Sequence, residues 1–168
     1  MAERPQAVKD RAGATSDRAI LDGSMRYLAL DVGERRIGVA LSDDTATLAT
    51  GLDTLTRVGP RKDAQAVAAL VRLHGPAAVI VGLPLNMDGT AGAQAEKVRA
   101  FVDGLKRHIT VPIVERDERL TTVEAHEILR KSGVSWRQRG ALLDKVSAVV
   151  ILQEFLDQQR AAGPRPTS

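Results

Sequence analysis

Three acidic residues lie far apart in the sequence, each at the edge of an apolar segment. Asp31 closes one apolar run, Glu118 follows another, and Asp144 opens a late apolar helix. An acid at such a position must be solvated, paired or bound to metal, because an isolated buried carboxylate is too costly to keep charged. Convergence of the three would form a site for Mg²⁺ or Mn²⁺, which prefer hard oxygen ligands.

Each acid also has a structural alternative. Asp31 could accept hydrogen bonds from the amides of a hairpin turn. Asp144 could complement the dipole of a helix from its first turn. Glu115 and Asp117 compete with Glu118 as ligands, and spacing alone does not choose among these acids.

The elements that must position these acids follow from the spacing of apolar residues. Runs at 27–31 and 37–42, separated by a glycine-containing turn, predict a β-hairpin. The order β-β-β-α-β-α-β-α-α then predicts an α/β fold, with a hairpin-edged mixed sheet of five strands continued by parallel strands and covered by helices on both faces. Beyond the hairpin, we expect strands at 51–57, 77–81 and 111–114, and helices at 64–73, 93–107, 122–131 and 141–158.

The composition favours one domain. The chain has 168 residues, of which 43% are hydrophobic but only 2% aromatic, so small aliphatic side chains must fill the core. We predict a disordered arm at 1–24, a domain at 25–160 and a flexible tail at 161–168. Met25 directly precedes the first strand, which raises the hypothesis that the natural protein begins there.

Several classes of protein are disfavoured by what the sequence lacks. It has no cysteine, which excludes disulfides, thiolate catalysis and cysteine-bound zinc. The three histidines show no metal-ligand spacing. No apolar stretch reaches the roughly 18 residues that a membrane span requires, so we expect a soluble, cytoplasmic protein that does not contact membranes.

A basic segment follows the predicted helix at 122–131. No acid occurs between Glu127 and Asp144, and Trp136 offers a ring for stacking on a base. The segment predicts contacts to phosphates, although a solvated basic loop explains it equally well. Its cations are Arg130, Lys131, Arg137 and Arg139.

The glycine-rich loop at 82–92 is a second candidate for binding phosphate. Its glycines and the start of the next helix expose backbone N–H groups, yet it lacks the Lys-Ser/Thr ending of a nucleotide-binding P-loop. A simple connection between strand and helix is the alternative. Within this loop Asn86 is the predicted substrate contact. Three arginines are candidate phosphate clamps or surface ion-pair partners: Arg35, Arg36 and Arg119.

Four sequence blocks, taken together, resemble the YqgF family, also called RuvX. They occur in the order of the family and span about residues 26–158. An Asp-x-Gly block alone would also fit sugar kinases and actin-like ATPases, but the four ordered blocks are specific. The blocks are 30–40 (LDVGERRIGVA), 82–90 (GLPLNMDGT), 117–122 (DERLTT) and 144–148 (DKVSA).

The resemblance implies an RNase H-like fold and a metal-dependent nuclease with Asp31, Glu118 and Asp144 as catalytic carboxylates and metal ligands. Its implied substrate is the precursor of 16S ribosomal RNA, which would bring the protein to ribosomal particles. The alternatives are a Holliday junction resolvase acting on DNA and a nucleic-acid-binding module without catalysis. Either a monomer or a homodimer is compatible with the sequence.

Overall fold

A computed structural model of the chain describes residues 25–118, 121–135 and 139–162. The predictions for 1–24, Arg119, Trp136, Arg137 and 163–168 lie outside the described residues. The expected order of elements is confirmed. The strands are β1 (Tyr27–Val32), β2 (Arg36–Ser42), β3 (Ala49–Thr56), β4 (Ala78–Leu83) and β5 (Ile113–Asp117), and the helices are α2 (Pro60–His74), α3 (Ala93–Leu105), α4 (Thr121–Lys131) and α5 (Arg139–Ala161).

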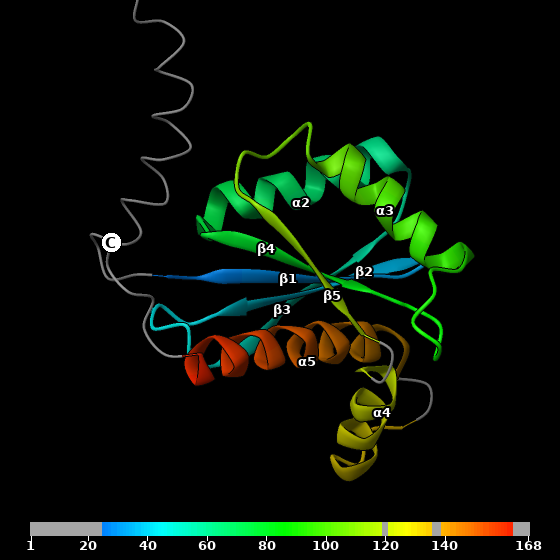
Figure 1. Cartoon of the computed structure of the whole chain (residues 1–168). Coiled ribbons are helices and arrows are strands. Elements are labelled where there is room, and N and C mark those ends of the chain that lie inside the picture. Colours follow the sequence, from blue (N-terminus) through cyan, green and yellow to red (C-terminus); the bar gives the residue numbers. More distant parts are fainter. Residues whose placement is uncertain (1–24, 119–120, 136–138, 163–168) are drawn as a thin grey trace, which may run out of the picture.

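The five strands form one mixed sheet in the order β3-β2-β1-β4-β5. The hairpin side is antiparallel, and β4 and β5 continue the sheet in parallel with β1. Helices α2 and α3 cover one face and α5 covers the other, while α4 extends away from the sheet beside α5 (Figure 1). The predicted sheet with helices on both faces is therefore confirmed. No helix in the described ranges combines the length and apolarity needed to cross a bilayer.

Strand β5 begins and ends later than predicted. The sequence favoured 111–114, whereas the strand runs from Ile113 to Asp117. Pro112 has no N–H for the ladder, but its carbonyl accepts a hydrogen bond from the Val79 N–H at 2.9 Å. As a result, Glu115 and Asp117 lie within the strand, and Glu118 is the residue that follows it.

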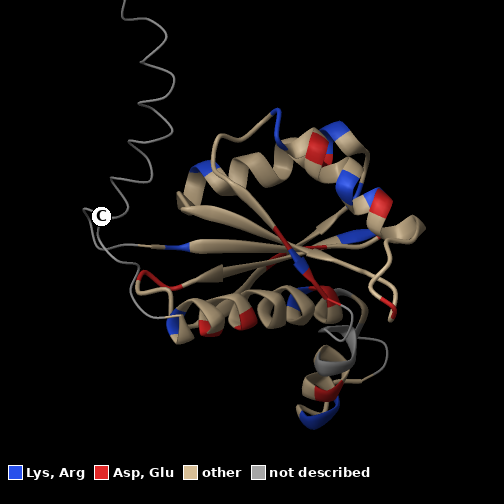
Figure 2. Ribbon diagram, in the orientation of Figure 1, with Lys and Arg blue, Asp and Glu red and all other residues tan. Residues whose placement is uncertain are grey.

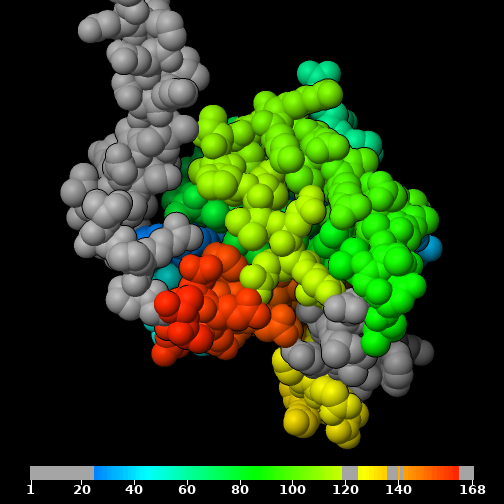
Figure 3. Space-filling model, viewed as in Figure 1, coloured from blue at the N-terminus to red at the C-terminus, as the bar shows by residue number. Residues whose placement is uncertain are grey.

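The two faces of the sheet carry side chains of different size, because successive residues of a strand point to opposite faces. Leu28, Leu30 and Val32 of β1 face α2 and α3 within the larger core. Beneath α5, Ala29 lies in the second core, and a Cβ added to Gly38 would come within 1.9 Å of the Asp144 carbonyl oxygen. Helix α5 therefore packs directly on strand backbone, as its close fit against the domain in Figure 3 shows.

Candidate active site

Asp31 lies in the ladder of the central strand. It pairs with Gly38 of β2, and its neighbour Leu30 pairs with Val81 of β4. The hairpin turn is closed without it, by a 2.9 Å hydrogen bond from the Gly33 N–H to the Arg36 carbonyl. Asp31 shares its face of β1 with Ala29, so its carboxylate points to the side covered by α5. The alternative of a turn acid does not describe this position.

Glu118 reaches the same face from the end of β5. Its N–H donates to the Leu83 carbonyl at 3.1 Å, which extends the pairing of β4 and β5. Its carboxylate lies over Gly82, where an added Cβ would be only 2.5 Å from Oε2. Glycine at this position leaves the room that the carboxylate occupies.

The strand period separates Glu118 from its two competitors. Glu115 and Asp117 lie at odd positions of β5, together with Ile113, which packs against the core under α2 and α3. Glu115 accordingly lies 3.9 Å from Arg99 of α3. Of the three acids, Glu118 is the one that shares a face with Asp31.

Asp144 approaches from α5 rather than from a strand. The helix begins at Arg139, so Asp144 lies in the second turn, and the first turn contains no acid. This position corrects the expectation that Asp144 opens the helix, and it argues against a simple interaction with the helix dipole. The Asp144 Oδ2 accepts a hydrogen bond from the Arg36 Nε at 2.8 Å across 108 residues of sequence.

Burial and mutual repulsion set the protonation of these acids. Burial and the negative charge of Asp144 raise the pKa of Asp31 to about 7, although a hydrogen bond from the Ser147 side chain opposes this shift. Burial, followed by the charges of Asp31 and Asp117, raises the pKa of Glu118 to about 8. Asp31 thus interacts with an acid on each side, and a nearby cation would relieve the repulsion.

The chemistry of these donors fits a divalent cation, but the arrangement is not a closed ligand set. Within the described residues, no three Asp, Glu or His side chains are grouped as they stand to hold an ion. Asp144 is committed to Arg36, whose side chain is 37% exposed and therefore able to move. Carboxylate oxygens suit Mg²⁺ or Mn²⁺, and loading all three acids would require Asp144 to exchange Arg36 for the cation.

Two of the predicted substrate contacts are near the same end of the sheet. Arg35 is exposed in the turn between β1 and β2, and its carbonyl accepts the Arg57 N–H at 2.8 Å. Asn86 is exposed in the loop after β4, where its Nδ2 donates to the Thr90 Oγ1 at 3.0 Å. Its amide also packs against Gly92, so this side chain helps to shape the loop.

The predicted basic segment is only partly described. Arg130 and Lys131 are exposed at the end of α4. Arg130 donates to Glu127 at 2.9 Å one turn earlier, which reduces the positive charge available for phosphate. The backbone of Arg139 begins α5, whereas its side chain lies outside the described residues.

Ser147 is a site residue to which the sequence analysis assigned no role. It is 2% exposed, and its hydrogen bond to Asp31 favours the charged carboxylate. Asp144 and Ser147 are three positions apart on α5, so both side chains share one helix face. That spacing was the available signal, and its use required knowing that Asp31 lies opposite.

Residues 25–158 match the RuvX family, which is described as Holliday junction resolvase. This chain belongs to the RuvX family. One relative, from Roseiflexus sp. (strain RS-1), is 50% identical over 136 residues, covering 80% of this chain and 96% of its own. Another, from Thermoanaerobacter pseudethanolicus, is 45% identical over 137 residues, covering 81% and 99%. Both are named "Putative pre-16S rRNA nuclease".

Solved structures establish the RNase H-like fold that was expected for a RuvX protein. T. thermophilus RuvC in complex with a Holliday junction substrate matches with a TM-score of 0.53 at 18% identity, covering 81% of this chain and 96% of its own. The Fowlpox virus resolvase with Holliday junction DNA matches with a TM-score of 0.52 at 13% identity, covering 80% and 99%. At these identities the likeness shows the fold alone.

Proposed function

We propose that this RuvX protein is a metal-dependent endonuclease that hydrolyses phosphodiester bonds in structured RNA. The observation that carries this proposal is the pair of charge-coupled carboxylates, Asp31 and Glu118, beneath the helix that carries Asp144. The curated relatives are named for precursor 16S rRNA, which supports processing of its 5′ end as the task and ribosomal particles as partners.

In this proposal the three acids hold two divalent ions, Mg²⁺ or Mn²⁺. Asp31 is central and would contribute to both ions, while Glu118 and Asp144 would hold one each. Bound ions of this kind lower the pKa of a water nucleophile and neutralise charge on the attacked phosphate and the leaving oxygen. Ser147 keeps Asp31 oriented and favours its charged form.

The arginines supply the remaining positive charge. Arg36 neutralises Asp144 in this structure, and when a cation takes that carboxylate its guanidinium becomes available to a substrate phosphate. The turn bearing Arg35 and the loop bearing Asn86 lie at the same end of the sheet and extend the proposed contact surface. Further proposed contacts are Arg119, Arg130, Lys131, Arg137 and Arg139.

Cleavage of defined substrates by the purified protein tests this function. The substrates are precursor 16S RNA, unstructured single-stranded RNA and four-way DNA junctions, each with Mg²⁺, Mn²⁺ or a chelator. We expect metal-dependent cleavage of the precursor RNA, lost in Asp31→Asn while circular dichroism shows the fold retained. Equal cleavage by Asp31→Asn would contradict the assigned site.

A DNA-junction resolvase is the second candidate, favoured by the description of the RuvX family. It would use the same carboxylates, so the catalytic chemistry does not separate the two. Symmetric cleavage of four-way junctions without cleavage of precursor RNA would favour the resolvase. Tight binding of RNA without cleavage of any substrate would indicate a non-catalytic binding module.

A further inference from the structure

A basic groove lies on the face of the sheet opposite the carboxylates. It has a volume of about 450 Å³ and separates the first turn of α2 from the end of α3. Basic ribbon segments mark both sides of it in Figure 2. The residues that line it are Pro60, Arg61, Ala64, Gly104, Arg107 and His108.

The cations of this groove lack acidic partners. Arg61, Arg107 and His108 are exposed, and none makes an ion pair or side-chain hydrogen bond with another residue in the part of the chain that the structure describes. The nearby acid Asp103 lies 3.9 Å from Lys106 instead. Unneutralised guanidinium groups in a concave site concentrate positive potential, which attracts phosphate.

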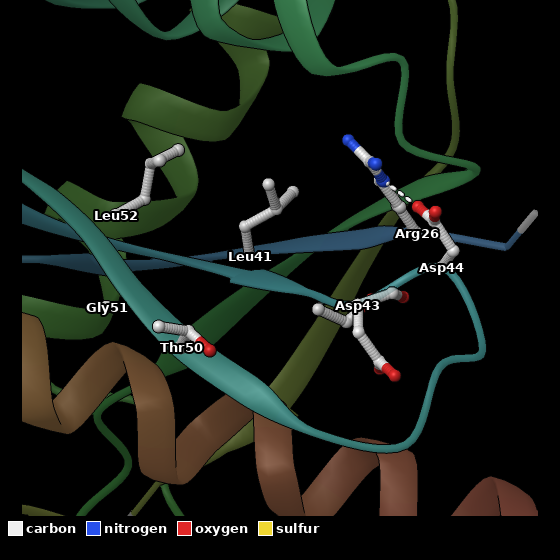
Figure 4. Close-up of a pocket in the computed structure, with 8 residues that line it drawn as sticks. Arg26, Leu41, Asp43, Asp44, Thr50, Gly51 and Leu52 are labelled. Carbon is white, nitrogen blue, oxygen red and sulfur yellow. Dashed lines mark hydrogen bonds and ion pairs between the residues drawn. The ribbon is translucent and has the colours of Figure 1, made fainter.

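A second hollow provides an internal comparison. It has a volume of about 380 Å³ and lies where β1 begins and β2 ends (Figure 4). Its arginine, Arg26, forms an ion pair with Asp44, and Asp43 also lines it. That hollow therefore has no excess of positive charge, whereas the groove between α2 and α3 has one.

The groove is connected to the carboxylate end of the sheet through Arg57. Its Nη1 donates to the carbonyl of Gly33 at 2.9 Å, two residues after Asp31. Its guanidinium also lies 5.5 Å from the centre of the Phe101 ring, one helical turn before Gly104. The groove and the carboxylates thus lie at the same end of the sheet on opposite faces.

We propose that this groove binds the sugar-phosphate backbone of the RNA substrate away from the cleaved bond. The proposal rests on the proposed nuclease function and adds a second contact surface to it. Two arginines can pair with phosphate oxygens, and the volume lies within the range of sites for small ligands, which accommodates a nucleotide-sized segment. Such contacts position a substrate without reading its sequence.

Gly104 allows a charge to be placed in the groove without a steric clash. A Cβ added there meets no heavy atom within 4 Å, leaving aside its chain neighbours and the nearby backbone of its own helix. Gly104→Glu and Gly104→Gln introduce side chains of nearly equal size, so they differ mainly in charge. Replacing a helical glycine with either residue also favours the helix.

The experiment measures binding of fluorescent precursor RNA at several salt concentrations, with every variant in an Asp31→Asn background to prevent cleavage. We expect Gly104→Glu to weaken binding about tenfold and Gly104→Gln less than twofold. Arg61→Ala with Arg107→Ala should also weaken binding about tenfold and lower the salt dependence by about 0.7 to 0.9 per lost phosphate contact. Arg72→Ala, an exposed cation near the other end of α2, is the matched control and should leave binding unchanged.

Unchanged RNA affinity in Gly104→Glu would overturn the groove proposal, even if the groove were found to bind inorganic phosphate alone. Equal losses in Gly104→Glu and Gly104→Gln would also overturn it, because charge would then not be the cause. The proposed nuclease function fails by a different result. Groove-dependent RNA binding by a protein that cleaves no RNA would reject catalysis and leave the groove intact.

Discussion

Two buried carboxylates on opposite faces of the sheet are treated in opposite ways. Asp63, in the first turns of α2, is 4% exposed and accepts hydrogen bonds from the Val58 N–H at 2.9 Å and from Arg57 Nε at 3.0 Å. Burial alone would raise its pKa, but these bonds together lower the pKa of Asp63. Asp31 receives a hydrogen bond from Ser147 but lies beside another acid, and its pKa is raised.

The difference indicates which acid is structural and which is available for chemistry. Donors and a guanidinium already satisfy the charge of Asp63, and the same Arg57 fixes the β1–β2 turn through Gly33. The charge of Asp31 remains poorly compensated, so a bound cation would gain the interaction that the protein does not supply. Burial alone does not mark a functional acid; burial with incomplete compensation does.

The largest expected effect is on catalysis by Asp31→Asn. If Asp31 holds the catalytic cations, the variant should lose cleavage by about 1,000-fold, equivalent to about 4 kcal/mol of transition-state stabilisation. Without metal its melting temperature should stay the same or rise, because one source of repulsion is removed. Single-turnover cleavage and calorimetry measure these two quantities, and a strong loss of stability would place Asp31 with the structural acids.

Asp63→Ala should have the opposite profile. It removes the acceptor of a buried ion pair and of two backbone N–H groups, so we expect a loss of about 3 kcal/mol in the free energy of unfolding. Denaturant titration measures it. Asp103→Ala, an exposed acid with a 3.9 Å ion pair, is the control and should change stability by less than about 0.5 kcal/mol. Equal effects of the two variants would remove the distinction drawn for Asp63.

Stability against pH should separate the two kinds of acid next. The folded pKa values of about 7 for Asp31 and about 8 for Glu118 exceed the ordinary values of 3.8 and 4.5. Metal-free stability from these groups is therefore complete below about pH 4 and declines as the pH rises to about 8. We expect the melting temperature to fall by several degrees over that range and to recover with Mg²⁺ or Mn²⁺.

The lowered pKa of Asp63 has the opposite sign. Its contribution to stability is present above the ordinary value of 3.8 and declines as the pH falls below it. The double variant Asp31→Asn with Glu118→Gln should flatten the decline between about pH 4 and 8 and leave the acid limb unchanged. A decline that persists in the double variant would mean that other groups cause it.

The smallest expected effect concerns Arg36. Its ion pair with Asp144 is partly exposed and weak, so Arg36→Ala should tighten Mn²⁺ binding to the nucleic-acid-free protein by no more than about fivefold. Isothermal titration calorimetry measures that affinity, with Arg35→Ala as the control. Weaker binding in Arg36→Ala would show that Arg36 positions Asp144 for the cation instead of competing with it.

Local sequence rules predicted much of the fold. Alternation and helical spacing predicted the element order, and the four motif blocks indicated the family. The limits of β5 were missed because apolar spacing does not mark a strand that continues through Glu115, Arg116 and Asp117. Counting alternate positions from Ile113 would have separated Glu118 from Glu115 and Asp117, but the correct start of the strand was needed first.

The sequence by itself determined where the strands and helices form and which acids could be ligands, because those properties depend on a residue and its near neighbours. Only the tertiary structure decided how each charge is compensated: Arg36 against Asp144, Arg57 against Asp63, and Arg61 and Arg107 facing a groove. These partners are set by strand register and helix packing. Those features bring together residues that no short-range pattern relates.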